Sequence, residues 1–225
     1  MTLAADTSSI EDSKFDSLFP AGVRAHSELH WTPVAVAEAA AKYLVTQPGT
    51  RVLDVGSGSG KFCLVAASLS DGHFIGVEQR ANLVATAQTA AAKLQLQNVE
   101  FHAQNILEIS FADFDSFYLY NPFAENEPGG HKIDRAVKLS LELRARYVRH
   151  SRSALGARPL GTRVVSYAGF DDEIPDCYVR VETSFGGELK FWEKMHGYDD
   201  ALDRLRLKTG RSYSGEAGWA APRQR

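Results

Sequence analysis

The sequence predicts an α/β fold in which a doubly wound, mostly parallel sheet carries helices on both faces. Short apolar runs alternate with helical patterns through the first half of the chain, and a glycine-rich loop joins the first such run to a helix. Two further runs near the C-terminal end predict an antiparallel hairpin. The composition agrees, because 44% hydrophobic and 24% charged residues are ordinary for a globular protein.

The predicted elements begin at residue 32. Thr32 and Pro33 start a helix that runs to about Val45, because threonine caps helix N-termini and proline suits the first helical position. Four β-branched or apolar runs then predict strands, and helical patterns separate the first three of them. The strands span 51–55, 73–78, 99–103 and 117–120, and the helices span 60–68 and 81–96.

The second half of the chain predicts one long helix and three strands. Amphipathic spacing indicates a helix over 133–153, followed by a strand over 162–167. The alternating runs 178–183 and 188–193 are joined across Gly186-Gly187, which is typical of a hairpin. The final pair of strands is therefore expected to be antiparallel.

Both ends of the chain are expected to lie outside a domain that spans 26–196. Residues 1–25 are acidic and lack periodicity, which predicts a flexible N-terminal arm, and residues 197–225 form a polar, basic tail. The chain shows no signal peptide and no apolar run near the roughly 20 residues that cross a bilayer. We therefore expect a soluble, cytoplasmic protein with no membrane partner.

Cysteine content and charge exclude several classes of function. Cys63 and Cys177 are too few for a disulfide framework or a structural zinc site, and the histidines form no recognisable ligand set, so no metal is expected. A net charge of -3 gives no overall attraction to nucleic acid. Residues 132–163 differ, with nine Lys and Arg against two acids. This region could contact an acidic partner, or it could be a solvated helix face.

The strongest chemical signal is the glycine-rich loop at 54–60 (DVGSGSG), between a predicted strand and a predicted helix. Glycines there let the backbone turn tightly and approach a ligand, which meets free N–H groups at the helix N-terminus. Glu78 follows Gly60 by 18 residues, at the end of the next strand, where a carboxylate can bind ribose hydroxyls. The alternative is that the glycines only form a tight turn between strand and helix and that Glu78 is a solvated residue at a strand end. The G-x-G-x-G spacing disfavours a nicotinamide oxidoreductase, whose fingerprint is G-x-G-x-x-G.

Residues 52–60 (VLDVGSGSG) resemble the first motif of class I S-adenosylmethionine-dependent methyltransferases, and the resemblance extends over roughly residues 30–195. It implies a Rossmann-like sheet of seven strands, the last one antiparallel, and S-adenosylmethionine as cofactor, with S-adenosylhomocysteine as product. It also implies a set of cofactor-binding residues, namely Asp54, Gly56, Ser57, Gly58, Gly60, Glu78, Gln79, Asn105 and Ile106.

The resemblance gives these residues separate roles. The glycines approach the methionine part of the cofactor, and Asp54 lies under its ammonium group. Glu78 holds the ribose. Asn105 stands where the family usually has an aspartate and binds the adenine amino group, while Gln79 and Ile106 flank the ring.

Asn121, Pro122 and Phe123 follow the fourth predicted strand and are the expected catalytic residues. Amino-directed methyltransferases commonly carry Asn or Asp, Pro, Pro and an aromatic there, so the match is partial. Carbonyl acceptors can orient the N–H bonds of an amine, and an aromatic can stack on a planar base. The run is also similar to the non-SET (disruptor of telomeric silencing type) lysine methyltransferase family. The alternative is a simple turn with a core aromatic.

The predicted function is methyl transfer to a nitrogen of a protein side chain, a nucleobase or a small amine. The alternative is a non-catalytic S-adenosylmethionine-binding module with a regulatory or scaffolding role. Residues 124–131 could form a lid over the acceptor or an exposed connection. If a proton acceptor is needed, it is expected among Tyr120, Glu125, Glu127 and His131.

Overall fold

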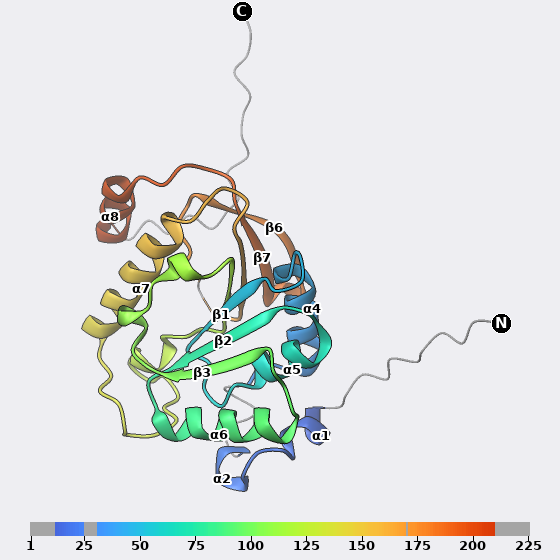
Figure 1. Cartoon of the computed structure of the whole chain (residues 1–225). Helices are drawn as coiled ribbons and strands as arrows, with labels where there is room; N and C mark the ends of the chain where they lie inside the picture. Colours follow the sequence, from blue (N-terminus) through green and yellow to red (C-terminus); the bar gives the residue numbers. More distant parts are fainter. Residues whose placement is uncertain (1–11, 25–30, 170, 210–225) are drawn as a thin grey trace, which may run out of the picture.

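A seven-stranded sheet forms the centre of the computed structural model, which describes residues 12–24, 31–169 and 171–209 (Figure 1). The strands are β1 (Arg51–Val55), β2 (His73–Glu78), β3 (Val99–Ala103), β4 (Ser116–Leu119), β5 (Arg163–Tyr167), β6 (Tyr178–Ser184) and β7 (Leu189–Lys194). Their order is β3-β2-β1-β4-β5-β7-β6. The first five strands are parallel, and β7 is antiparallel to both β5 and β6. This confirms the predicted mostly parallel, doubly wound sheet with a C-terminal hairpin.

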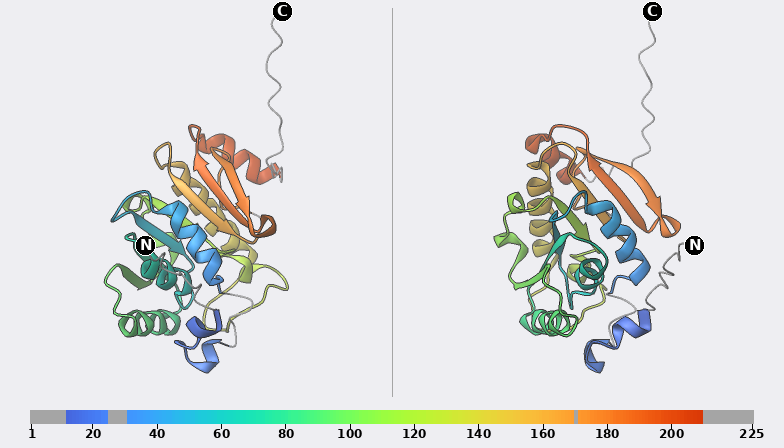
Figure 2. Two further views of the ribbon diagram at one scale, coloured as in Figure 1. Left: turned by 90° about the vertical axis from the view of Figure 1, so that its right-hand side faces the viewer. Right: turned by 45° about the vertical axis from the view of Figure 1, so that its right-hand side comes forward.

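Helices cover both faces of the sheet (Figure 2). One face carries α4 (Val34–Leu44), α5 (Lys61–Leu69) and α6 (Ala81–Lys93), and the other carries α7 (Leu141–Gly156) and α8 (Asp200–Thr209). Alternate residues of β1 face the two layers, since Val52 packs with α4 and α5 whereas Leu53 packs with α7. The sheet is therefore buried between two hydrophobic cores, one on each face.

Short 3-10 turns connect several of these elements. They are η1 (Ile106–Glu108), η2 (Phe111–Asp113), η3 (Ala124–Asn126) and η4 (Phe185–Gly187). The turn at η4 is the hairpin connection predicted at Gly186-Gly187, and Gly186 there has a φ of 69°. Two of the turns, η1 and η3, lie in the segments that follow the carboxyl ends of β3 and β4.

Residues 12–24 form two short helices instead of the expected flexible arm. These are α1 (Asp12–Asp16) and α2 (Ala21–Arg24), which lie near α6 (Figures 1 and 2). Phe15 and Phe19 are buried, and the Phe19 ring lies 4.6 Å from that of Trp31. Helices of four and five residues carry no readable periodicity, and tertiary contacts hold them. Residues 1–11 and 25 lie outside the described residues.

An ion cluster fastens this N-terminal segment to the start of α5. The Lys61 ammonium, 4% exposed, lies 2.5 Å from a carboxylate oxygen of Asp12 and 2.6 Å from one of Asp16. Another contact ties Asp12 to α4, because its carboxylate accepts a hydrogen bond from the backbone N–H of Val34. The buried lysine thus has two anionic partners that both come from α1.

The long helix predicted over 133–153 begins only at Leu141. Ser140 has an extended backbone and its hydroxyl accepts a hydrogen bond from the N–H of Leu143, so it caps the helix. The preceding residues are not helical because tertiary contacts compete with helix formation. Arg135 and Lys138 therefore do not share a helix face with Arg146, and the predicted basic face is divided between a loop and a helix.

The predicted polar tail also contains an ordered helix, α8. Arg152 of α7 is 6% exposed, and its guanidinium donates three hydrogen bonds of 2.5 to 3.1 Å to the Asp203 carboxylate of α8. This buried pair holds α8 against α7. Residues 210–225 lie outside the described residues. Among the helices that the structure describes, none has the length and apolarity needed to cross a membrane.

Candidate functional site

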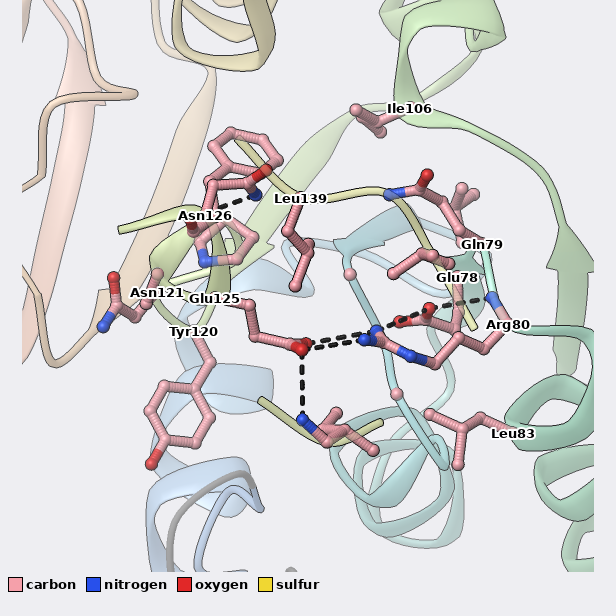
Figure 3. A pocket seen from close by; sticks show the side chains of 18 of the residues that line it. Glu78, Gln79, Arg80, Leu83, Ile106, Tyr120, Asn121, Glu125, Asn126 and Leu139 are labelled. Atoms are coloured by element: carbon pink, nitrogen blue, oxygen red, sulfur yellow. Dashed lines mark hydrogen bonds and ion pairs between the residues drawn. The ribbon is translucent and has the colours of Figure 1, made fainter. Parts of the chain in front are cut away.

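A cavity of about 270 Å³ lies at the carboxyl ends of the parallel strands (Figure 3). Ligands of open α/β sheets bind at this edge, because loops diverge there and leave a crevice. The walls come from the loop after β1, the end of β2, the loop after β3, the segment after β4 and the N-terminal region. Eight of the twelve predicted site residues line it, namely Gly56, Gly58, Glu78, Gln79, Ile106, Asn121, Pro122 and Phe123.

The three glycines of the loop perform two different tasks. All have positive φ, at 76° for Gly56, 55° for Gly58 and 83° for Gly60. A Cβ on Gly58 would meet no atom within 4 Å, so this backbone borders open space. A Cβ on Gly60 would lie 2.5 Å from the Phe101 ring, so Gly60 lets α5 pack closely on the sheet. Gly60 thus fills the packing role of the third glycine in a dinucleotide fingerprint.

The loop after β1 also touches the predicted catalytic segment. A Cβ on Gly56 would lie 3.3 Å from the Cβ of Pro122. The absence of a side chain at Gly56 therefore allows the segment after β4 to approach the loop after β1. The structure brings the predicted cofactor and acceptor motifs into contact at this point.

Asp54 and Ser57 lie behind the cavity wall. Asp54 is 3% exposed and accepts a hydrogen bond of 3.3 Å from the Cys63 thiol. Burial raises the pKa of this carboxyl from 3.8 to about 7. The Ser57 hydroxyl lies beside Gly76 of β2, where a Cβ would come within 2.7 Å of it. Neither residue contributes to the cavity lining, so both support the loop from beneath.

Ser59 is a cavity residue that sequence reasoning missed. Its hydroxyl is buried and has no hydrogen-bond partner among the described residues. Ser59 also lines the cavity. Buried polar atoms are nearly always paired, so an unpaired hydroxyl beside a cavity indicates a polar ligand. The serines between the glycines were the available signal, although the sequence cannot show which one faces the ligand.

Glu78 lies at the end of β2 with its carboxylate at the cavity wall. It is 7% exposed and accepts a hydrogen bond of 2.9 Å from the backbone N–H of Arg80. Burial raises the pKa of Glu78, and the hydrogen bond and charge of Arg80 oppose that shift. The carboxylate is therefore held in place while still bordering the cavity, as ribose binding requires.

Asn105 does not line the cavity but supports residues that do. Its side-chain oxygen accepts from the N–H of Leu107, which caps η1. Its amide nitrogen donates a hydrogen bond of 3.1 Å to the side-chain oxygen of Gln79 and another of 3.1 Å to the Tyr147 hydroxyl. The Tyr147 ring in turn stacks on Phe123 at 5.1 Å. Asn105 therefore acts, in this structure, by positioning the wall formed by Gln79 and Tyr147.

The predicted catalytic residues point in different directions. Asn121 is exposed, has a φ of 41°, and its side chain lies against Gly169, away from Glu78 (Figure 3). Phe123 is 5% exposed and stacks on Tyr147, so it forms part of the cavity wall. A left-handed backbone at an asparagine is tolerated, and strain of this kind is common at functional sites.

Other cavity residues that the sequence did not indicate come from the N-terminal region and from the position just after β2. Val23 belongs to residues 1–25, which were expected to lie outside the domain, and Trp31 belongs to the first residues of the predicted domain. Arg80, two residues after Glu78, is 5% exposed and faces the segment after β4 (Figure 3). No sequence pattern marks a buried arginine, because its burial depends on anionic partners far along the chain.

Comparisons with known proteins agree with this architecture. A family model described as a methyltransferase domain matches residues 46–129. An arsenite methyltransferase from Halobacterium salinarum is 41% identical over 68 residues, which is 29% of this chain and only 17% of that protein's length. The match to this curated relative is therefore confined to a small part of it.

Solved structures share the fold at low sequence identity. An RNA methyltransferase from Salinibacter ruber, solved in complex with S-adenosylhomocysteine, has a TM-score of 0.53 and 21% identity, covering 76% of this chain and 98% of the other. A SAM-dependent O-methyltransferase from Thermotoga maritima has a TM-score of 0.52 and 17% identity, covering 80% and 73%. At these identities the likeness concerns the fold alone.

The site fits S-adenosylmethionine as a cofactor. Gly58 and the unpaired Ser59 hydroxyl border the part of the cavity where the methionine end would lie, and Glu78 and Gln79 border the part for the ribose and adenine. The sheet order, this fit and the matched segment agree with one another. The chain therefore has the Rossmann-like fold that class I methyltransferases share, and the match of residues 46–129 to a methyltransferase-domain model supports S-adenosylmethionine as the cofactor.

Proposed function

We propose that this protein transfers the methyl group of S-adenosylmethionine to a nitrogen acceptor at the Asn121–Phe123 side of the cavity. One observation carries the proposal: a single cavity joins Gly58 and Glu78 to Asn121, Pro122 and Phe123. Methyl transfer needs the acceptor in line with the methyl group, so both motifs must border one space. A protein side chain, a nucleobase and a small amine are the acceptor classes that we consider.

The bound cofactor supplies a methyl group on a sulfonium, which forms a bond to the acceptor nitrogen as the sulfur–carbon bond breaks. The chain's residues position the partners and exclude water. Trp31 and Tyr120 border the cavity with aromatic rings, and Tyr120 lies 4.9 Å from the Tyr167 ring. Such walls favour the neutral form of an amine by desolvation, and that form carries the nucleophilic lone pair.

The proton that the nitrogen loses needs a route to solvent. Burial raises the pKa of Tyr120, with smaller contributions from Tyr167 and Glu188, so this phenol stays protonated and is a poor base. His131 also lines the cavity and is exposed, so it can pass a proton to water. Glu125 is engaged in an ion pair with Arg80, and Glu127 pairs with Arg144 and does not line the cavity. Among the four candidates from the sequence, His131 is thus the proton acceptor that we favour.

The orientation of Asn121 supports a second candidate function. Its side chain lies against Gly169 and points away from Glu78, so in this arrangement its carbonyl is not turned toward the cofactor side of the cavity. A module that binds S-adenosylmethionine without transferring the methyl group, with a regulatory or scaffolding role, needs no such carbonyl. The similarity to non-SET lysine methyltransferases stays a prediction, as does contact of residues 132–163 with an acidic partner.

The first test is calorimetric titration with S-adenosylhomocysteine beside the same titration with NAD. We expect binding of the first and none of the second. The second test incubates the protein and methyl-tritiated cofactor with a cell lysate, followed by protease or nuclease digestion. Label in protein, nucleic acid or small molecules assigns the acceptor class, and Asn121→Ala is expected to reduce labelling while sparing cofactor binding. Cofactor binding without any labelled product would favour the non-catalytic module.

A further inference from the structure

The segment after β4 lies across the cavity as a strap, defined here as residues 124–139. Its residues Gly130, Ile133, Val137 and Leu139 line the cavity, as does the loop after β1. Leu139 projects into the space between Asn126 and Gln79, and Glu125 extends across it toward Arg80 (Figure 3). The strap is not helical beyond η3, so side-chain contacts have to hold its path.

Arg80 supplies such contacts with every nitrogen of its guanidinium. Two nitrogens pair with the Glu125 carboxylate, Nη1 to Oε1 at 3.1 Å and Nη2 to Oε2 at 2.7 Å. The third, Nε, donates to Oδ1 of Asp134 at 2.9 Å. Bidentate pairing of this kind is both stronger and more directional than a single ion pair. One arginine at the end of β2 thus holds two carboxylates of the strap.

The strap presents these two carboxylates in fixed directions. The backbone N–H of Ile133 donates to Oε2 of Glu125 at 3.1 Å, and that of Ala136 donates to Oδ1 of Asp134 at 2.9 Å. Each carboxylate therefore joins the strap's own backbone to Arg80. If the guanidinium were removed, the carboxylates of Glu125 and Asp134, which bind the backbone at Ile133 and Ala136, would lose their shared cationic partner.

The same guanidinium lies beside the carboxylate that borders the cofactor site. Nη1 of Arg80 is 3.6 Å from Oε1 of Glu78, and the Arg80 backbone N–H donates to that oxygen at 2.9 Å. Three carboxylates thus surround one buried cation, and two of them, Glu78 and Glu125, are themselves largely buried. Removing one partner from such a cluster leaves desolvated charge of one sign.

We propose that Arg80 is a positioning residue that couples the cofactor carboxylate Glu78 to closure of the strap, so that cofactor release requires the Arg80–Glu125 fork to open. The proposal rests on the proposed use of this cavity for S-adenosylmethionine. It assigns Arg80 no contact with the reacting atoms. Its effect is to slow exchange of cofactor and product while the strap covers the cavity.

The test compares Arg80→Lys and Glu125→Gln with Asp200→Asn. Lysine keeps the charge of Arg80 but loses the fork, and glutamine keeps the shape of Glu125 but loses its charge. Asp200→Asn is the matched control, because it neutralises one carboxylate of an exposed ion pair with Arg204 on α8. A thermal melt of each variant checks that the fold is retained.

Stopped-flow dissociation of S-adenosylhomocysteine is the first readout. A charge-assisted pair contributes about 1.5 to 3 kcal/mol, so we expect dissociation roughly 10- to 150-fold faster in Arg80→Lys and in Glu125→Gln. The double variant should dissociate no faster than the faster single variant, because both changes break one fork. Rates equal to those of the unmodified protein and of Asp200→Asn would overturn the proposal.

Amide hydrogen exchange of the ligand-free protein is the second readout. The amides of Ile133 and Ala136 bond to Glu125 and Asp134, not to Arg80, so Arg80→Lys leaves their direct partners intact. We expect both amides to exchange faster in Arg80→Lys while the amides of β1 stay unchanged. If all amides of Arg80→Lys, including those of β1, exchanged faster, Arg80 would only stabilise the fold and the proposal would fail. If the unmodified protein binds no S-adenosylhomocysteine, the proposed function fails, and strap exchange still decides whether Arg80 holds the strap.

Discussion

Substitution of Gly60 by alanine tests the division of labour within the glycine-rich loop. The added Cβ would lie 2.5 Å from one ring carbon of Phe101, 2.6 Å from another and 2.9 Å from the Cβ of Ala87. None of these three contacts involves the end of a flexible chain, so the helix–sheet packing has to shift. The φ of Gly60 is also 83°, which L-residues rarely adopt.

The expected loss of stability combines these two effects. A left-handed backbone costs an alanine about 1 to 2 kcal/mol, and overpacking a close-packed core costs about 1 to 3 kcal/mol. Gly49→Ala is the matched control, since Gly49 has a φ of 79° but a Cβ there would meet nothing within 4 Å. The change in unfolded-state entropy is the same in both variants and cancels. Gly60→Ala should therefore be less stable than Gly49→Ala by about 1 to 3 kcal/mol.

Urea denaturation followed by circular dichroism measures this difference, with calorimetric titration of S-adenosylhomocysteine as the second assay. Gly58→Ala provides the opposite case, because its Cβ meets no protein atom within 4 Å and Gly58 lines the cavity. We expect it to match Gly49→Ala in stability and to bind the ligand more weakly. If Gly60→Ala and Gly49→Ala unfolded at the same urea concentration, the packing role assigned to Gly60 would be refuted.

Three further predictions concern buried charges. Glu78→Ala should weaken S-adenosylhomocysteine binding by roughly 1 to 3 kcal/mol, as measured by calorimetry, because ribose hydroxyls would lose a buried partner; unchanged affinity would place the ribose elsewhere. Replacing Asp12 and Asp16 together by asparagine should destabilise the protein by about 3 to 5 kcal/mol in urea denaturation, because Lys61 is only 4% exposed and would be left unpaired. Lys61→Met should cost less, since Asp12 is 50% exposed and can be solvated, and the reverse order would contradict this reasoning. Burial raises the pKa of Glu173 from 4.5 to about 7, so its folded form binds a proton that the unfolded form releases. The stability that this group contributes is present below pH 4.5 and is lost as pH rises to about 7. The difference in unfolding free energy between Glu173→Gln and the unmodified protein should therefore shift in favour of the variant across that pH range. A difference that does not change with pH would rule out this titration.

The prediction of the sheet succeeded because its signals are local. Strand runs such as 51–55 and 99–103 have the same bounds in the sequence analysis and in the structure. The helix predicted over 133–153 failed at its first turns for a tertiary reason. Ile133 and Asp134 exchange helical hydrogen bonds for contacts with Glu125 and Arg80, and no local pattern reveals that competition.

The placement of the candidate site was predictable in part. Residues that follow strand ends reach the same edge of a parallel sheet, which explains why Glu78, Ile106 and Pro122 line one cavity. Their side-chain directions were not predictable. Asn121 lies against Gly169, and Asn105 supports Gln79 and Tyr147 instead of bordering the cavity. Such directions depend on neighbours far apart in sequence.

The sequence by itself determined the fold class, the hairpin and the glycine loop with its strand-end acid, because backbone geometry imposes residue types at regular spacing. Only the tertiary structure decided that Gly60 packs against Phe101, that Arg80 holds the strap across the cavity, and that α1 pairs with Lys61. These are contacts between a buried or crowded group and a distant partner. Burial and pairing are properties of the folded chain, so they have no periodicity that a sequence can display.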